Sequence, residues 1–221
     1  MPSPYKLLLH NESLWLSHER CIFWERERSL ILSDLHLGKT GHFRKSGIAV
    51  PQNIYKEDLH RLLAQIQYFN ATSLIIVGDL FHSSANKEMD LFLKWRKDLA
   101  SIKIELIKGN HDILSKMFYT NAAVNVSDKH WLKDPFCFTH DITLKCNNEI
   151  VKDNYTFSGH IHPGIKINGL GRQSLKFPCF SFSKEFAVLP AFSRFTGLTS
   201  LRPEAGDQIF AIIENNLLQI Q

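Results

Sequence analysis

The run Gly109-Asn110-His111-Asp112 places three chemically capable side chains in consecutive positions. An imidazole can take up or release a proton near neutral pH, and a neighbouring carboxylate can hold it in one tautomer. An amide oxygen is a neutral donor to a metal ion, and the glycine permits a tight turn. A polar turn after a strand would explain the run equally well, so its meaning depends on the rest of the chain.

Four more clusters of aspartate and histidine follow apolar runs elsewhere in the chain. Each one alone is typical of a buried polar pair or a loop, but five such clusters at strand ends are hard to explain by chance. Nitrogen and oxygen donors without thiolates suit manganese, iron, zinc or cobalt. Seven donors exceed the needs of one ion with open positions and fit two ions about 3.5–4 Å apart. The predicted ligands are Asp34, His36, Asp79, Asn110, His140, His160 and His162.

The spacing within the clusters brings their side chains into one site that two ions would share. Side chains two residues apart on a strand face the same side, so Asp34 and His36 should point into one site. The same argument applies to His160 and His162. Asp79 stands alone at its strand end and is the expected bridge. The expected partition is Asp34, His36 and His162 at one ion, and Asn110, His140 and His160 at the other.

Alternating strands and helices between residues 29 and 112 would position the first clusters. Residues 29–33, 73–77 and 102–107 are apolar runs typical of strands buried on both faces. Apolar residues at helical spacing predict a helix that starts near Pro51 and another with Met89, Phe92, Trp95 and Leu99 on its apolar side. In open α/β sheets, ligands gather at the carboxyl ends of the strands, where these clusters lie.

Further strands are predicted on both sides of this region. We expect one domain over residues 1–221, an α/β (α+β) fold with two packed sheets and helices on the outside, because no repeat or low-complexity linker interrupts the chain. A short helical turn is expected at 114–118. The other predicted strands are 5–9, 13–17, 20–24, 122–126, 135–139, 155–158, 175–182, 186–190, 209–213 and 217–220.

The composition is that of an ordinary globular protein. The 221 residues are 44% hydrophobic and 22% charged, and a net charge of +4 is compatible with a phosphate-bearing partner without requiring one. No apolar run approaches the roughly 20 residues of a membrane span, and the N-terminus does not resemble a signal peptide. The cysteines form no CxxC pair, which argues against a disulfide framework, so we expect a cytoplasmic protein. They are Cys21, Cys137, Cys146 and Cys179.

The ordered motifs resemble those of the calcineurin-like binuclear metallophosphoesterases. They are Asp34-Leu35-His36, Gly78-Asp79, Gly109-Asn110-His111-Asp112, His140 and Gly159-His160-Ile161-His162. The resemblance implies a β-sandwich of two mixed sheets flanked by helices, with two metals held by the residues in the partition above. Two ions can lower the pKa of a bridging water to give a hydroxide that attacks phosphorus. His111 would then stabilise the transition state or protonate the leaving oxygen, and Asp112 would orient His111 or cap a helix.

A narrower resemblance extends over more of the chain. Residues 34–39, Phe43-Arg44, Gly47, Pro51 and residues 78–83 are similar to the ligase-associated DNA-damage-response endonuclease branch, although His82 stands where many relatives carry Asp or Asn. The resemblance implies a DNA substrate, single-stranded or nicked, and association with DNA ligase or helicase repair factors. Four side chains are candidates for binding this substrate, and each is also compatible with a solvated loop. They are Lys39, Phe43, Arg44 and His82, with Lys45 beside them.

These patterns predict a manganese-dependent phosphodiesterase that acts as a DNA endonuclease in repair, with iron, zinc or cobalt as alternative metals. The first alternative is a small-molecule phosphohydrolase acting on a nucleotide-linked pyrophosphate or a cyclic nucleotide. The second is a non-enzymatic scaffold, although scaffolds usually lose ligands and none is missing here. The sequence leaves the native metal, the cleavage polarity and the oligomeric state open, a homo-oligomer included.

Overall fold

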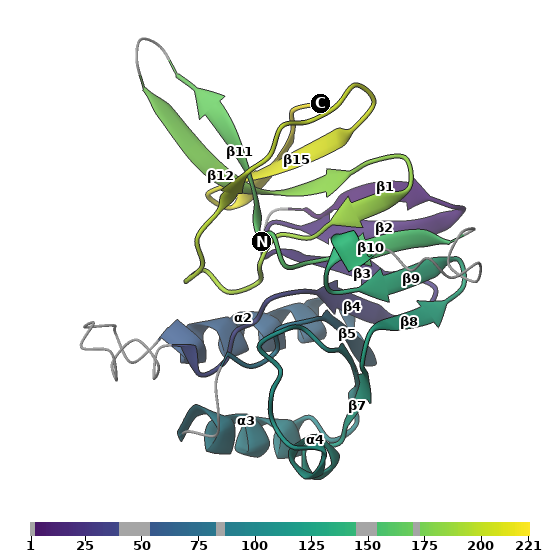
Figure 1. The fold of residues 1–221 in the computed structure, drawn as a ribbon, viewed down its shortest axis with the longest axis vertical. Coiled ribbons are helices and arrows are strands. Elements are labelled where there is room, and N and C mark those ends of the chain that lie inside the picture. The colour runs from purple at the N-terminus through teal and green to yellow at the C-terminus, as the bar shows by residue number, and fades with distance from the viewer. Residues whose placement is uncertain (1–2, 40–53, 83–86, 145–153, 170–172) are drawn as a thin grey trace.

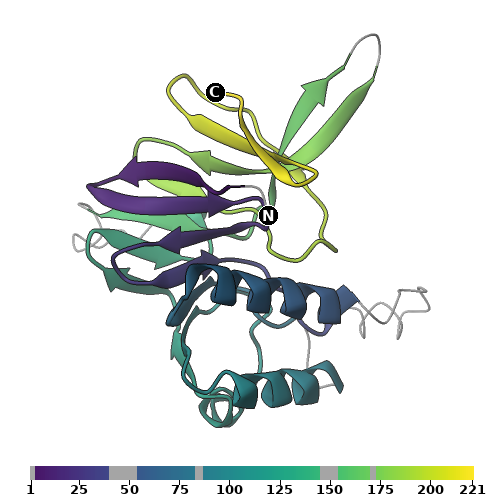
Figure 2. The ribbon, with the colours of Figure 1, turned by 180° about the vertical axis from the view of Figure 1, so that it is seen from behind.

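The protein is a sandwich of two β-sheets with helices covering the outer face of one sheet (Figure 1; Figure 2 shows the opposite side). A computed structural model describes residues 3–39, 54–82, 87–144, 154–169 and 173–221. The two mixed sheets and flanking helices confirm the predicted fold class. Among the described helices, none is long and apolar enough to cross a membrane.

The first sheet contains seven strands that follow one another in chain order. Neighbours from β1 to β4 are antiparallel, and neighbours from β4 to β7 are parallel. The strands are β1 (Tyr5–Leu9), β2 (Glu12–Ser17), β3 (Cys21–Trp24), β4 (Ser29–Leu32), β5 (Ser73–Val77), β6 (Lys103–Ile107) and β7 (Val124–Ser127). Helices α2 (Ile54–Phe69), α3 (Lys87–Asp98) and α4 (Lys116–Asn121) lie between the parallel strands in the chain.

The central strands are buried on both faces, as their continuous apolar runs predict. Leu30 and Leu32 of β4 pack into a core shared with the helices, whereas Ile31 packs into a second core between the two sheets. Side chains alternate across a strand, so an uninterrupted apolar run serves two cores at once. Phenylalanines from the second sheet fill much of the inter-sheet core. This double packing fixes the ends of the strands that carry the site.

The second sheet has nine strands, and three of its short strands were not predicted. Its main path runs β14-β11-β12-β13-β10-β9-β8, and β15 joins β12 to β16. The strands are β8 (His130–Lys133), β9 (Phe136–Thr139), β10 (Tyr155–Ser158), β11 (Pro163–Asn168), β12 (Ser174–Phe182), β13 (Phe186–Val188), β14 (Thr199–Ser200), β15 (Gln208–Ile213) and β16 (Asn216–Gln219), with a 3-10 turn at Ile142–Leu144. Strands β8 and β14 were not predicted because they are short and lie at the two ends of the main path. Strand β11 was not predicted because it begins with Pro-Gly.

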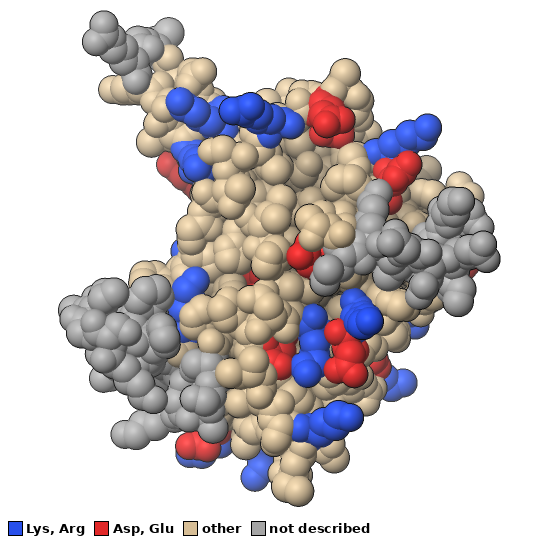
Figure 3. Space-filling model, in the orientation of Figure 1, with Lys and Arg blue, Asp and Glu red and all other residues tan. Residues whose placement is uncertain are grey.

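Strands β11 and β12 form a hairpin arm that projects from the body (Figure 1). Lys166 lies directly opposite Lys176 across the two strands, and the Lys176 ammonium donates a hydrogen bond to the Leu198 carbonyl at 3.1 Å. Lysine and arginine side chains gather on this part of the surface (Figure 3). The arm begins at Pro163, immediately after His162, so it is anchored next to a candidate ligand.

The described cysteines behave as the sequence predicts. Cys21, Cys137 and Cys179 are buried and form no disulfide among the described residues, and burial raises the pKa of Cys21 and of Cys179 to about 12. A thiol with so high a pKa remains protonated and inert at neutral pH. Cys146 lies outside the described residues.

Candidate metal centre

The candidate ligands follow strands of both sheets. Asp34 and His36 come after β4, Asp79 after β5, and Asn110 after β6. In the second sheet, His140 follows β9, and His160 and His162 follow β10. Strands β4, β5 and β6 are mutually parallel, as are β9 and β10, so these residues gather at carboxyl ends of strands.

Backbone conformation, rather than strand periodicity, directs these side chains into the site. Asp34 and His36 lie beyond the end of β4 and have positive φ angles of 54° and 50°. His160 and His162 lie beyond β10, with φ angles of 72° and 48°. The expectation that each pair shares one face of a strand was therefore wrong in its reason, although both members do approach the site. Non-glycine residues seldom adopt positive φ, and such strain clusters at functional sites.

The first group of converging donors is Asp34, His36 and His162. His162 Nε2 is 3.3 Å from Asp34 Oδ1, and His36 Nε2 is 3.8 Å from the same oxygen. The two imidazole nitrogens are 3.2 Å apart. Three donor atoms so close together around one point could hold a single cation. This group has the membership that the sequence predicts for one ion.

Asp79 stands between this group and the remaining histidines. Its Oδ2 is 3.9 Å from His36 Nδ1 and 3.5 Å from His140 Nε2. His140 Nε2 is also 3.2 Å from His160 Nδ1. One carboxylate thus faces donors from both predicted halves of the centre, which is the position that a bridging ligand needs. Asn110 is exposed on the neighbouring loop.

A backbone hydrogen bond fixes the orientation of the His140 ring. Its Nδ1 lies 3.1 Å from the Val77 carbonyl oxygen, which can only accept, so Nδ1 carries a proton and Nε2 faces the centre. Burial lowers the pKa of His140, but the interactions with Asp79 and Asp34 outweigh it and raise the pKa to about 9. Burial would raise the pKa of Asp79, yet His140 and the His111 N–H lower it to about 2.

Two buried polar atoms give a direct test of whether the residues fit a metal. Asp34 Oδ1 and His36 Nδ1 are buried and make no hydrogen bond within the described part of the chain. Burial lowers the pKa of His36 to about 3, against the effect of the Asp34 and Asp79 carboxylates, so its ring is neutral and keeps a lone pair. An unpaired buried carboxylate oxygen is costly, and a divalent cation would compensate it. The donor set therefore fits a divalent metal.

The loop after β6 is tied to Asp79 and to the end of β5. The His111 backbone N–H donates to Asp79 Oδ1 at 3.0 Å, and the His111 side chain, whose Nε2 is 4.0 Å from Asp79 Oδ2, remains partly exposed. The buried Asp112 carboxylate accepts hydrogen bonds from the N–H groups of Phe81 and Gly109, both at 3.0 Å. Burial raises the pKa of Asp112 to about 6. Asp112 therefore holds the loop through its backbone, and no hydrogen bond to the His111 ring occurs among the described residues.

The structure places two of the predicted substrate-binding residues beside the centre. The His82 ring lies 4.3 Å from that of His111 and 5.3 Å from that of His36, centroid to centroid. Burial lowers the pKa of the Lys39 ammonium, whereas the nearby Asp34 and Asp79 carboxylates raise it, which places this cation in the field of the centre. Phe43, Arg44 and Lys45 lie outside the described residues.

Phe192 and Ser193 form a segment beside Asp34 that supports it through backbone hydrogen bonds and that the sequence did not reveal. The Phe192 N–H donates to the Ser33 carbonyl at 2.8 Å, and the Ser193 N–H donates to the Asp34 carbonyl at 3.2 Å. Arg61 of α2 holds this segment by donating to the Phe192 carbonyl. No sequence pattern signals these contacts, because the partners are more than a hundred residues apart in the chain.

A two-sheet sandwich with a cluster of nitrogen and oxygen donors at its strand ends is an arrangement that a metal-dependent phosphoesterase requires. Residues 28–178 match the calcineurin-like phosphoesterase family, and the chain belongs to this family. The match includes every candidate ligand, from Asp34 to His162. Among curated proteins, no sequence matches the chain.

Solved structures give a more detailed comparison. The chain is similar to the Pseudomonas putida nuclease MPE, with a TM-score of 0.82, 25% identity, and coverage of 98% of this chain and 100% of that one. The Escherichia coli phosphoesterase Yfce has a TM-score of 0.45 at 14% identity, with 87% of this chain and 97% of that chain covered. AQ665 of Aquifex aeolicus has a TM-score of 0.44 at 17% identity, over 65% of this chain and 82% of that one.

Proposed function

We propose that this protein is a binuclear metal-dependent phosphodiesterase that cleaves DNA as an endonuclease in repair. The observation that carries the proposal is the convergence of Asp34, His36 and His162 on one side of Asp79 and of His140 and His160 on the other. Asn110 would complete the second set. The similarity to a nuclease over nearly the whole chain supports nucleic acid as the substrate. We propose manganese as the metal, with iron, zinc or cobalt as alternatives, because nitrogen and oxygen donors without thiolates suit these ions.

The protein's own side chains have distinct tasks in this proposal. When bound, the two ions supply Lewis-acid polarisation of the phosphate and lower the pKa of coordinated water. The buried Asp34 and Asp79 would hold the ions, and the hydrogen bond to the Val77 carbonyl keeps His140 Nε2 facing the centre, where it could coordinate a metal. His111 is partly exposed beside Asp79, so its Nε2 can approach the leaving oxygen and protonate it.

Lys39 and His82 would bind the substrate next to the ions. The Lys39 ammonium is close enough to the carboxylates of the centre to interact with them electrostatically, and it can neutralise a phosphate oxygen there. The His82 ring lies beside the His111 ring, so it can donate a hydrogen bond to the same phosphate. Phe43 and Arg44 remain sequence-based candidates for contacts to the flanking nucleotides.

One set of measurements on purified protein tests the proposal. We expect about two equivalents of manganese per chain by elemental analysis, and cleavage of circular single-stranded DNA. Asp79→Asn should reduce metal content at both sites, whereas His60→Ala, which alters an exposed histidine on α2, should leave it unchanged. His111→Ala should keep the metal and lower turnover by about 10²–10⁴-fold.

Two results would contradict the proposal in different ways. One metal per chain at full activity would exclude the binuclear centre. Hydrolysis of bis(p-nitrophenyl) phosphate without any cleavage of circular or linear DNA would retain the phosphodiesterase and exclude the nuclease. Loss of metal in His111→Ala would make His111 a ligand and not the proton donor.

A further inference from the structure

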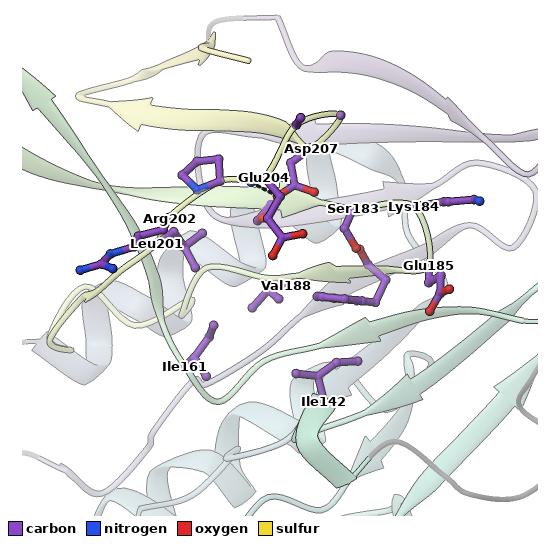
Figure 4. A pocket seen from close by; sticks show the side chains of 15 residues that line it. Ile142, Ile161, Ser183, Lys184, Glu185, Val188, Leu201, Arg202, Glu204 and Asp207 are labelled. Carbon is purple, nitrogen blue, oxygen red and sulfur yellow. Dashed lines mark hydrogen bonds between the residues drawn. The ribbon is translucent and has the colours of Figure 1, made fainter.

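A cavity of about 720 Å³ is lined in part by the short segment that also carries two candidate metal ligands (Figure 4). Ile161, which lines it, stands between the candidate ligands His160 and His162. Consecutive Cα atoms are only about 3.8 Å apart, so the cavity wall and the metal ligands belong to the same short segment. Ligand-binding pockets typically have volumes of about 300–1,000 Å³. The cavity therefore shares one wall segment with the centre and has the volume of a ligand site.

One side of the cavity is apolar. Ile142, Ile161 and Val188 approach it from below in Figure 4, and Leu201 closes it on the side of the 201–207 segment. Leu201 is only partly buried and belongs to neither of the two hydrophobic cores. These side chains form a surface suited to the face of a flat, apolar group.

The other side of the cavity offers hydrogen-bond acceptors. Glu204 and Asp207 carry carboxylates, and Asp207 Oδ2 already accepts from the Glu204 N–H at 2.9 Å. The Ser183 hydroxyl donates to the Phe186 carbonyl at 3.0 Å, which leaves its oxygen lone pairs for a ligand. The two basic side chains at the rim, Lys184 and Arg202, point away from the cavity in Figure 4.

This lining excludes a phosphate and favours a planar group with N–H donors. Three carboxylates line the cavity, those of Glu185, Glu204 and Asp207, and without an inward-pointing cation they repel an anion, while the apolar side accepts a ring face. We propose that the cavity is a nucleobase subsite, which holds the base of the nucleotide whose phosphate lies on the metals. This inference rests on the proposed phosphodiesterase function and adds a specificity site to it.

The acceptor lining predicts a preference among bases. Adenine, cytosine and guanine carry exocyclic amino groups that can donate to Glu204, Asp207 or Ser183. Thymine has no amino group, so it would leave these acceptors without that partner. A hydrogen bond of this kind changes a binding constant by roughly threefold to tenfold. Short strands with an amino-bearing base beside the scissile phosphate should be cleaved faster than matched strands with thymine there.

Filling the cavity tests the proposal directly. Leu201→Trp should lower kcat/KM on a short single-stranded DNA by tenfold or more and leave hydrolysis of bis(p-nitrophenyl) phosphate within about twofold, since that substrate has no base. Leu218→Trp is the matched control because Leu218 is 52% exposed on β16 and does not line the cavity. Thermal unfolding of both variants checks that they fold. Glu204→Gln, at an exposed position, should reduce the preference over thymine without loss of stability.

The outcomes separate this inference from the proposed function. Equal losses on both substrates, or no loss on either, would overturn the subsite while DNA cleavage by the unaltered protein stands. If the unaltered protein cleaves no DNA, the base could still come from a free nucleotide. Inhibition of bis(p-nitrophenyl) phosphate hydrolysis by free dAMP tests this. Inhibition that Leu201→Trp removes would support a base subsite for free nucleotides, and inhibition unaffected by that change would overturn it.

Discussion

Replacing Gly109 with alanine should disturb the centre through a single steric contact. A Cβ at this position would lie 2.5 Å from the Asp79 backbone nitrogen and 2.8 Å from Asp79 Cγ. The atom nearest to this Cβ would be Asp79 Oδ1. Ordinary contacts begin at 3.4 Å, so the loop must move about 0.9 Å from the Asp79 backbone nitrogen, and the carboxylate oxygen must move further. The φ of Gly109 is not positive, so alanine adds no backbone strain and the effect isolates the close approach.

The expected cost follows from overpacking a rigid site. Such insertions destabilise a folded protein by about 1–3 kcal/mol. For a chain of this size each kcal/mol lowers Tm by about 2–4 °C, so Gly109→Ala should melt about 2–12 °C lower. Because the displaced group is Asp79, manganese content and turnover should fall together. Differential scanning calorimetry and elemental analysis on the same preparation measure both.

Gly197→Ala is the matched control for this prediction. No heavy atom lies within 4 Å of a Cβ at Gly197, so this change should be neutral or stabilise by up to about 1 kcal/mol. If Gly109→Ala has the Tm, metal content and activity of the unaltered protein, the close packing of the loop against Asp79 is not required. The inference that a Cβ at position 109 displaces Asp79 would then be wrong.

Three further predictions concern metal, charge and pH. Manganese at 100 times its Kd should add about 2.7 kcal/mol to the free energy of unfolding and raise Tm by about 5–10 °C, and a chelator should reverse the shift. If Tm does not change, the folded protein has no metal site. Lys166→Glu should stabilise the β11–β12 arm by roughly 0.5 kcal/mol in chemical denaturation because it faces Lys176, and Lys166→Gln should give less; equal effects would rule out pairing. Burial raises the pKa of Glu19, but Arg61 and Arg194 outweigh it and lower the pKa below its ordinary value of 4.5. The depressed pKa means that the Glu19 carboxylate stabilises the fold above pH 4.5 and loses this effect in more acidic solution. Glu19→Gln should therefore lower the free energy of unfolding by about 2 kcal/mol at pH 7 and by progressively less below pH 4.5. A loss of unfolding free energy that does not change with pH would contradict this.

The sequence was sufficient for the fold class and for residues that gather at the strand ends. Continuous apolar runs such as Ser29–Leu32 predict doubly buried strands because burial on both faces requires apolar side chains at every position. The polar residues after such strands have no place in either core. The types of Asp34, His36 and His140 therefore predicted that they approach one another, even without knowledge of the second sheet's pairing.

Other features depend on contacts that no local pattern encodes. The positive φ angles at Asp34 and His36 replace the strand periodicity that the sequence suggested, and they arise from tertiary packing. Strand β11 begins with Pro163-Gly164, a pair typical of loops, and its pairing with β12 and β14 makes it a strand. The hydrogen bond from the Arg61 guanidinium to the Phe192 carbonyl joins residues 131 positions apart. Only the folded chain reveals such partners.

The long separation between ligands has a consequence for protein synthesis. His36 and His162 face each other across 126 positions of the chain, and His160 donates its N–H to Asp34 across the same interval. A chain growing from the ribosome therefore lacks two of the seven candidate ligands, His160 and His162, until strand β10 and the residues after it have emerged, and β10 must then pair beside β9. Both sheets must be assembled before the donors converge, so an incomplete or misfolded chain lacks the complete donor set. We therefore expect phosphoester hydrolysis only after both sheets have formed.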